Sequence, residues 1–506
     1  MINLDGNSLT LEELEAIADR FEPIALDRSA ARAVDAARAV VDRYAAGDAP
    51  VYGINTGFGS LAEVKIAREA LGDLQRNLLR SHAAGVGEPL PVRAVRAAMA
   101  LRANVLAKGY SGVRRETLER LIDAVNSRVH PIVPSRGSVG ASGDLAPLAH
   151  LALVLIGEGE ATVGDATAIV DGRRALERAG LTPIDLGPKE GLALINGTQV
   201  SAAVAALALL GAERLARCAD IAAALSIDGL RGSYHPFEQR LHDPRPYDGQ
   251  RRSAANLLQL LQSSAINKSH ENCGRVQDAY SMRCAPQVHG AGRDALAYGR
   301  ATLQIEANAA TDNPMVFADS GEIVSGGNFH GAPVALAADV MVLALQQFAT
   351  ISERRADRLV NPALSGLNPF LTRDSGLQSG YMMAQVTAAA LVSELKTLAH
   401  PASADTIPTS ANREDHVSMS MAAALKAQRA LDLATRVIAV EILLACQALD
   451  LLAPLTTSPA LAPVHAYVRA HVPTLDGDRP PAPDIEWIAA AITGGAVERA
   501  CGAEVK

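Results

Sequence analysis

Five long runs rich in alanine and leucine constrain the fold of this chain more than any other feature of its sequence. Apolar residues recur in them at three- and four-residue spacing, and breaks containing proline and glycine separate them. They cover residues 198–228, 288–310, 333–360, 380–398 and 417–453. The pattern predicts a bundle of long helices. Because one chain would struggle to bury so many apolar faces, we expect burial between subunits.

The N-terminal part predicts shorter elements, and we expect two domains, 1–197 and 198–506. Thr10 and Glu13 form a capping-box pattern that begins the first helix. Helical periodicity recurs around 67–80, 92–107 and 114–127, whereas the glycine-rich stretch 51–60 predicts an irregular loop. Residues 161–171 predict a small hairpin or ribbon.

Charge and cysteine usage narrow the function classes. The net charge of -8 offers no attraction for nucleic acid or an anionic membrane. The five cysteines are scattered, and the N-terminus lacks a basic segment followed by an apolar core, so we expect a cytoplasmic protein. Polar residues interrupt the uncharged stretch Gly191–Ala212, and no membrane span is predicted.

The tripeptide Ala141-Ser142-Gly143 can form an electrophile that no side chain supplies. Attack of the Gly143 nitrogen on the Ala141 carbonyl carbon, with loss of two waters, makes a methylidene-imidazolone ring. Glycine permits the close backbone approach, serine has a hydroxyl to eliminate, and alanine is small. An isolated Gly-Ala-Ser-Gly match would be an ordinary turn, so its context must decide.

The whole stretch Gly137–His150 resembles the signature of the aromatic amino acid ammonia-lyases, a family that includes histidine, phenylalanine and tyrosine ammonia-lyases and related aminomutases. The resemblance implies a mainly α, fumarase/histidase-like (L-aspartase-like) long-helix bundle, with an N-terminal lobe that carries the cofactor loop. It also implies a homotetramer with shared active sites, and a 4-methylidene-imidazol-5-one (MIO) formed autocatalytically from Ala141, Ser142 and Gly143, with no metal. Further matching motifs spread over nearly the entire chain, at 52–59, 81–89, 190–199, 276–284, 325–330 and 408–419.

The same resemblance implies roles for other residues. Tyr52 would be the base that removes a β-hydrogen, which requires a phenolate stabilised by positive charge or hydrogen-bond donors. Asn196, in an otherwise apolar run, would contact the ring carbonyl or the substrate. Phe329 would supply an aromatic wall.

Gln277, Tyr280 and Arg283 follow one another at three-residue spacing and would share one face if their segment is helical. Taken alone, they would be a polar exposed stripe. By the resemblance, Arg283 would hold a substrate carboxylate through two hydrogen bonds. Gln277 and Tyr280 would orient the substrate or relay protons.

His82 and Glu414 point to the substrate. Phenylalanine-selective members of the family carry Phe-Leu where this chain has His82-Ala83, and tyrosine-selective ones carry His-Leu. Glu414 falls where both usually have glutamine, and its carboxylate can accept an imidazole N–H, whereas a phenyl ring would strand that charge. We therefore expect L-histidine as substrate and trans-urocanate as product. Arg413 departs from the histidine-specific pattern, with no consequence that the sequence defines.

Three alternatives remain. The first is a tyrosine or phenylalanine ammonia-lyase or aminomutase of the same family. The second is a non-catalytic helical scaffold stabilised by zinc, because His270, Cys273, Cys284 and His289 have a superficially zinc-like spacing. The third is the fumarase and argininosuccinate lyase group, but the Gly-Ser-Ser-x-Met-Pro-x-Lys-x-Asn loop of that group is absent from this sequence.

Overall fold

The computed structural model describes residues 1–58, 63–271, 273–274 and 276–506, so positions 59–60 of the expected glycine-rich loop lie outside the described residues. The chain groups into two compact units. Unit 1 comprises Met1–Leu207, Arg300–Asp339 and Pro401–Leu425, and unit 2 comprises Ala208–Gly299, Val340–His400 and Lys426–Lys506. The expected division of the chain at residue 197 remains a prediction.

Each of the five long runs is a helix, so the expected mainly α fold is confirmed. The absence of proline from the interior of these runs lets their backbone hydrogen bonds continue over many turns. The helices are α9 (Gln199–Gly229), α14 (Ala285–Glu306), α15 (Ala332–Val360), α17 (Met382–Leu398) and α18 (Ser420–Leu451).

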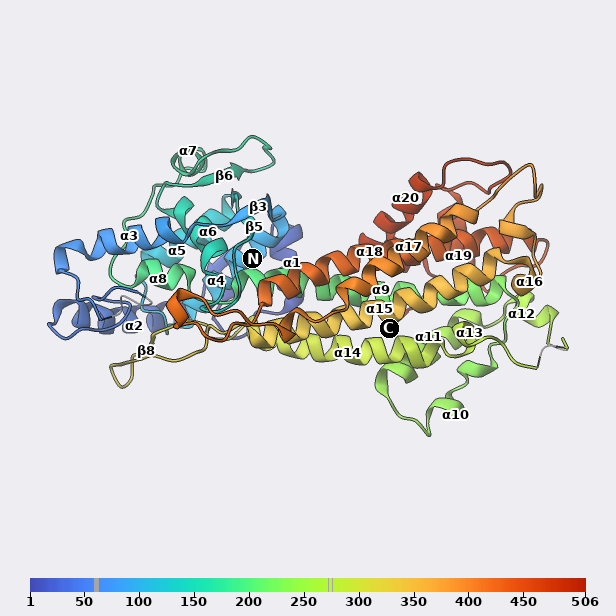
Figure 1. Ribbon diagram of the computed structural model, residues 1–506, viewed down its shortest axis with the longest axis horizontal. Coiled ribbons are helices and arrows are strands. Elements are labelled where there is room, and N and C mark those ends of the chain that lie inside the picture. The colour runs from blue at the N-terminus through green and yellow to red at the C-terminus, as the bar shows by residue number, and fades with distance from the viewer. Residues whose placement is uncertain (59–62, 272, 275) are drawn as a thin grey trace. The chain divides into compact units, whose positions relative to one another are not determined.

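In unit 2, α9, α14, α15 and α18 lie side by side (Figure 1), and buried polar contacts join them. Glu441 of α18 accepts hydrogen bonds from Ser226 Oγ of α9 (2.7 Å) and Arg355 Nη2 of α15 (2.9 Å). Asp220 of α9 pairs with His289 of α14 at 2.7 Å. Shorter elements complete the unit: η3 (His235–Phe237), α10 (Gln239–His242), α11 (Asp248–Leu261), α12 (Ala265–Ser269), α13 (Tyr280–Arg283), α16 (Pro362–Ser365), η4 (Pro369–Leu371), α19 (Ala462–Arg469), α20 (Ala482–Thr493) and α21 (Ala496–Ala500).

Unit 1 is built around α4 (Val92–Ala107), which is buried over nearly its whole length and packs against α1 and α5. The capping box predicted at Thr10 and Glu13 is present at the start of α1. The other helices of this unit are α1 (Leu11–Asp19), α2 (Arg28–Ala46), η2 (Arg68–Ala70), α3 (Leu71–His82), α5 (Arg115–Asn126), α6 (Leu145–Leu155), α7 (Gly172–Arg178), α8 (Glu190–Ile195), η5 (Ala402–Ala404) and η6 (Ser410–Asn412). The predicted helices around 67–80, 92–107 and 114–127 are thus confirmed.

Short strands of unit 1 pair in four small sheets. The predicted ribbon at 161–171 is confirmed, because β6 (Glu160–Val163) pairs antiparallel with β7 (Val170–Asp171) and also with β4 (Val129–Pro131). The remaining pairs are parallel β1 (Ile2–Leu4) with β2 (Ile24–Leu26), and antiparallel β3 (Val86–Pro89) with β5 (Pro134–Arg136) and β8 (Met315–Phe317) with β9 (Glu322–Val324).

Two helices, α9 and α15, are long and apolar enough to cross a membrane by length and composition. In their most apolar windows, however, 83% and 67% of the residues are buried inside the protein. Such burial is typical of core helices, whose apolar side chains contact other parts of the same fold.

Candidate functional site

The loop between β5 and α6 carries Ala141-Ser142-Gly143, and two of its glycines are required by its geometry. Gly143 has φ +75°, and a Cβ there would lie 2.2 Å from the carbonyl oxygen of Gly197. Gly140 has φ +67°, and a Cβ there would lie 2.3 Å from Ser418 Oγ. Since left-handed backbone and close contact both exclude a side chain, only glycine fits these positions.

Asn196, at the C-terminal end of α8, faces this loop. Its Nδ2 donates to the carbonyl oxygen of Ser142 at 2.9 Å, and its side chain is almost completely buried. The Gly197 carbonyl oxygen in turn accepts from the Asp144 N–H at 2.7 Å. Closure of an imidazolone ring would make the Ser142 carbonyl the ring carbonyl, so the Asn196 amide already lies where a donor to that oxygen is needed. The residues present therefore fit the ring.

Asp144 anchors the loop to α9 through its carboxylate, a role that was not predicted from the sequence. Its Oδ2 accepts from both the N–H (2.7 Å) and the Oγ (2.9 Å) of Ser201, in the first turn of α9, and its Oδ1 accepts from Ser138 Oγ (3.0 Å). Burial raises the pKa of Asp144. A carboxylate at the start of a helix is stabilised by the free N–H groups there, and here it also anchors the loop.

Four helix N-termini are linked to this loop. Helix α6 begins directly after it, and Asp144 bonds the first turn of α9. The Gly331 N–H, just before α15, donates to Gly140 O (3.3 Å), and the Met419 N–H, just before α18, donates to Val139 O (2.8 Å). Because helix N-termini carry partial positive charge, the loop lies in a region that favours negative charge.

Glu414 lies directly on Ser142. Its Oε1 accepts from Ser142 Oγ at 2.6 Å, and its Oε2 accepts from Thr409 Oγ1 at 2.6 Å. The residues between Thr409 and the neighbouring Arg413, Ser410 to Asn412, have φ between 49° and 68°. Three consecutive left-handed residues cost conformational energy, which is typical of segments held for a functional reason.

His82 ends α3 with its imidazole half-buried. Its Nδ1 lies 2.9 Å from the Leu78 carbonyl oxygen, so we assign the ring proton to Nδ1 and the lone pair to Nε2. Burial lowers the pKa of His82, and the hydrogen bond to Leu78 and the nearby Glu414 charge partly oppose this shift. The neutral imidazole is therefore the favoured form near neutral pH, and its Nε2 can accept a hydrogen bond.

Tyr52 and Phe329 belong to the same unit. The half-buried Tyr52 ring meets Phe58 edge to face at 6.3 Å, in the loop where Gly53 has φ +77° and packs against Leu192 and Pro314. The half-buried Phe329 precedes α15, and the next residue, His330, approaches the His416 carbonyl oxygen through Nε2 at 3.2 Å.

Gln277, Tyr280 and Arg283 all belong to unit 2. The segment is helical only over α13 (Tyr280–Arg283), so the condition for one shared face is not met and Gln277 precedes the helix. Arg283 nevertheless gathers the three residues, since its Nη2 donates to Gln277 Oε1 (3.0 Å) and its guanidinium lies over the Tyr280 ring (4.7 Å). Gln277 and Arg283 line a cavity of about 650 Å³, in which the buried Nε of Arg283 has no hydrogen-bond partner among the described residues.

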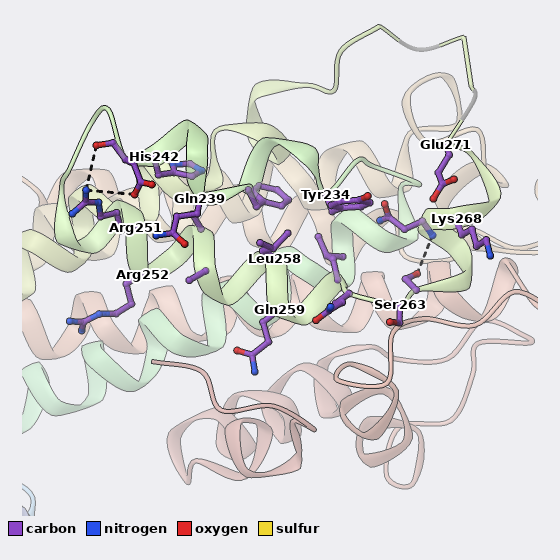
Figure 2. A pocket seen from close by; sticks show the side chains of 18 of the residues that line it. Tyr234, Gln239, His242, Arg251, Arg252, Leu258, Gln259, Ser263, Lys268 and Glu271 are labelled. Carbon is purple, nitrogen blue, oxygen red and sulfur yellow. Dashed lines mark hydrogen bonds and ion pairs between the residues drawn. The ribbon is translucent and has the colours of Figure 1, made fainter.

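A cavity of about 1190 Å³, larger than the one beside Arg283, also lies in unit 2, between the 234–243 segment and helices α11 and α12 (Figure 2). Tyr234, His242, Arg251 and Lys268 line it. Of the described residues that line it, none is a predicted site residue. A larger volume therefore does not mark this cavity as the predicted site.

The two histidines of the zinc-like pattern make other contacts. His289 Nδ1 pairs with Asp220 at 2.7 Å in the core of unit 2, and His270 Nδ1 lies 2.8 Å from the Ile266 carbonyl oxygen. Within the described ranges, no three side chains of the His, Cys, Asp and Glu types are placed to share a metal ion.

Comparison with known proteins agrees with this geometry. A family model for aromatic amino acid lyases matches residues 9–470. Histidine ammonia-lyases from Anaeromyxobacter dehalogenans (strain 2CP-C) and Myxococcus xanthus (strain DK1622) are 56% and 55% identical, covering 98% of this chain and 99% and 97% of their own. The crystal structure of histidine ammonia-lyase from Trypanosoma cruzi matches with a TM-score of 0.92 and 44% identity, over 99% of this chain and 94% of that one. A tyrosine aminomutase from Streptomyces globisporus matches with a TM-score of 0.94 and 38% identity, over 100% of both chains. The chain belongs to the aromatic amino acid lyase family.

Proposed function

We propose that this protein eliminates ammonia from L-histidine to give trans-urocanate, as part of histidine degradation. The observation that carries the proposal is the contact between Glu414 and Ser142, at 2.6 Å, because it puts a carboxylate beside the electrophile-forming serine. An imidazole N–H can donate to that carboxylate, whereas a phenyl ring has nothing to offer it. The names of the relatives at 55% and 56% identity support the same substrate.

We propose that Ala141, Ser142 and Gly143 form the methylidene-imidazolone autocatalytically and that no metal takes part. When formed, the ring supplies an electron-poor methylidene carbon, an electrophile that protein side chains lack. The left-handed glycines, the Asn196 donor and the four helix N-termini all support this assignment. The donors would stabilise negative charge on the ring carbonyl, which is the Ser142 oxygen.

The substrate would be held at its two ends. Arg283 would bind the α-carboxylate with a forked pair of hydrogen bonds, and Gln277 and Tyr280 would orient it. His82 and Glu414 would hold the imidazole ring: a neutral imidazole has one N–H, which either the Glu414 carboxylate or the Nε2 lone pair of His82 would accept. Phe329 would form an aromatic wall beside the rings.

Tyr52 would remove the β-proton as the ammonia leaves, so that a C–H and a C–N bond break and the C=C bond of urocanate forms. A phenolate can act in this way where positive potential stabilises it. Asn196 and the helix N-termini would hold the loop while charge shifts onto the Ser142 oxygen. The imidazole of the substrate itself withdraws electrons from the β-carbon, which makes the proton easier to remove.

We propose a cytoplasmic homotetramer in which the Arg283 group of one subunit and the Ser142 group of another share a site. Exposed apolar side chains on unit 2 support association, among them Leu343 of α15 (47% exposed) and Met383 and Val386 of α17 (59% and 45%). Exposed apolar surface of this kind commonly marks a subunit interface.

A second candidate is a tyrosine or phenylalanine ammonia-lyase or aminomutase. The close structural match to a tyrosine aminomutase favours keeping it, because the fold is nearly the same. The difference would lie in what faces the substrate ring and in the fate of the released ammonia, which a mutase adds back at the β-carbon.

The deciding experiment incubates purified protein with L-histidine, L-tyrosine and L-phenylalanine separately, follows the conjugated acrylate spectrophotometrically, and measures ammonia and β-amino acids in parallel. Urocanate with equal ammonia from histidine alone supports the proposal. Formation of coumarate or cinnamate would show that the substrate is tyrosine or phenylalanine instead of histidine. Formation of β-tyrosine or β-phenylalanine would show that the enzyme is an aminomutase instead of a lyase. If none of the three amino acids gives a product, the proposed function is contradicted.

A further inference from the structure

Arg102 lies on the buried helix α4, and its side chain is completely buried (0% exposed). Its Nη1 donates to the main-chain carbonyl oxygen of Asn196 (2.6 Å) and to Gln199 Oε1 (2.8 Å). Gln199 Nε2 in turn donates to Thr311 Oγ1 (2.6 Å). Complete burial of an arginine is rare and costly, so its contacts require an explanation.

The segment that Arg102 contacts is the one that holds the proposed ring. Asn196 donates to the Ser142 carbonyl oxygen through its side chain, while its own carbonyl oxygen accepts from Arg102. Gly197, which follows, accepts from the Asp144 N–H, and a Cβ on Gly197 would lie only 2.7 Å from Arg102 Nη1. The guanidinium is therefore packed against the backbone that aims the Asn196 amide.

Arg102 also supplies charge. A second buried basic side chain, Lys189, lies nearby and pairs with Asp312 at 3.2 Å, so Asp312 already has an ion-pair partner other than Arg102. Burial lowers the pKa of Arg102 to about 10, which still leaves it protonated at neutral pH. A charge in a dry interior acts over several ångströms, because little water screens it.

We propose that Arg102 is the positioning residue of the Ser142 site: it holds the Asn196–Gly197 backbone in place and adds positive potential behind the Ser142 carbonyl. The inference rests on the proposed function, in which that carbonyl accumulates negative charge. Arg102 touches neither the substrate nor Ser142 and acts through Asn196.

A second arginine on the same helix provides a matched control. Arg96 is 1% exposed and donates to the main-chain oxygens of Ile17 (3.0 Å) and Val125 (2.9 Å). It thus has the same burial, the same helix and the same kind of acceptor, and none of these contacts reaches a predicted site residue. Arg102→Lys and Arg96→Lys should cost comparable folding stability, and only the first should change the site.

The experiment measures intact peptide mass over residues 141–143, kcat and KM for L-histidine, and assembly of the full-length chain. We expect Arg102→Lys to lower kcat about tenfold or more with little change in KM. We expect Arg102→Met to lower kcat and also the fraction of chains in which the 141–143 peptide has lost two waters. The Arg96→Lys variant should keep both the dehydrated peptide and kcat. An assembled Arg102→Lys variant with full dehydration and wild-type kcat would overturn the proposal, as would equal losses in Arg96→Lys.

Two further arms keep the inference separable from the function itself. Should the Arg102 variants not fold, Gln199→Met, which removes one of the two acceptors of Nη1, should still lower kcat, and unchanged kcat in that folded variant overturns the proposal. If the wild-type peptide is dehydrated but histidine is not converted, the substrate proposal fails, while the peptide masses of the variants still decide the role of Arg102. A wild-type peptide that retains both waters overturns the ring and this inference together.

Discussion

The hydroxyl of Ser142 donates to the carboxylate of Glu414 at 2.6 Å, although the two residues lie 272 positions apart in the chain. In the proposed function, the contact joins the hydroxyl that would be lost in ring formation to the carboxylate that would select histidine. It depends on pairing of the 417–420 segment with the loop, where Met419 N–H donates to Val139 O and Ser418 Oγ donates to Gly140 O. The proposed electrophile and the proposed substrate contact thus lie side by side in the fold.

Ser142→Ala should abolish turnover and leave an assembled protein, because alanine has no hydroxyl to eliminate. The mass of the 141–143 peptide should show no loss of water in this variant. Ser138→Ala is the control, since Ser138 donates to Asp144 Oδ1 but contributes no atom to the ring. Near-normal turnover by Ser142→Ala would exclude the ring as the electrophile.

Glu414→Gln should lower kcat/KM for L-histidine about tenfold or more, because the amide oxygen can still accept the imidazole N–H but lacks the charge that strengthens such a bond from about 1 to about 1.5–3 kcal/mol. Activity on L-phenylalanine should fall much less. Thr409→Val, which removes only the hydrogen bond to the other carboxylate oxygen, should have an intermediate effect. Equal losses on both substrates, with normal peptide dehydration, would contradict a role in specificity.

Arg283→Lys should raise KM for L-histidine about tenfold or more while changing kcat less, because lysine cannot form the forked pair with a carboxylate. Arg231→Lys is a suitable control. It lines the same cavity, yet its guanidinium donates to the Ser365 carbonyl oxygen. Steady-state kinetics on both variants would separate the two cases, and an unchanged KM in Arg283→Lys would rule out carboxylate binding by this residue.

The parts of the fold that depend on local periodicity were predictable. Helices α4, α5, α9 and α18 follow their apolar spacing, and the cap at Thr10 follows from side-chain chemistry. The extent of α13, which excludes Gln277, was not predictable, because a single helical turn depends on tertiary contacts such as the bond from Arg283 to Gln277. The left-handed residues Ser410–Asn412 gave no signal either, since they are not glycine.

Within the site, the residues that touch Ser142 could be proposed from motifs, but the supporting residues could not. Asp144 stands inside a quoted motif, yet its contact with Ser201 requires the fold. Arg102 had no distinguishing signal in the sequence, because the same Ala/Val-rich helix also carries Arg93 and Arg96. Its partner at Asn196 is 94 residues away, and only three-dimensional packing defines such a pair.

A buried histidine outside the site should make stability depend on pH. His130 of β4 is 2% exposed, and burial, with the nearby Arg96 and Arg128 charges, lowers its pKa to about 4. In the unfolded chain the pKa of a histidine is about 6.5. Between these two pKa values the unfolded chain binds more protons than the folded chain. The contribution of His130 to the free energy of unfolding should therefore be fully present above about pH 6.5, and it should fall by at most about 1.4 kcal/mol per pH unit towards pH 4. Urea unfolding between pH 7 and 4.5 measures this dependence. The free energy of unfolding of His130→Leu should change less with pH than that of the wild type, whereas His400→Gln, at an exposed position, should leave the slope of the free energy against pH unchanged. Identical slopes for wild type and His130→Leu would show that His130 does not carry this dependence.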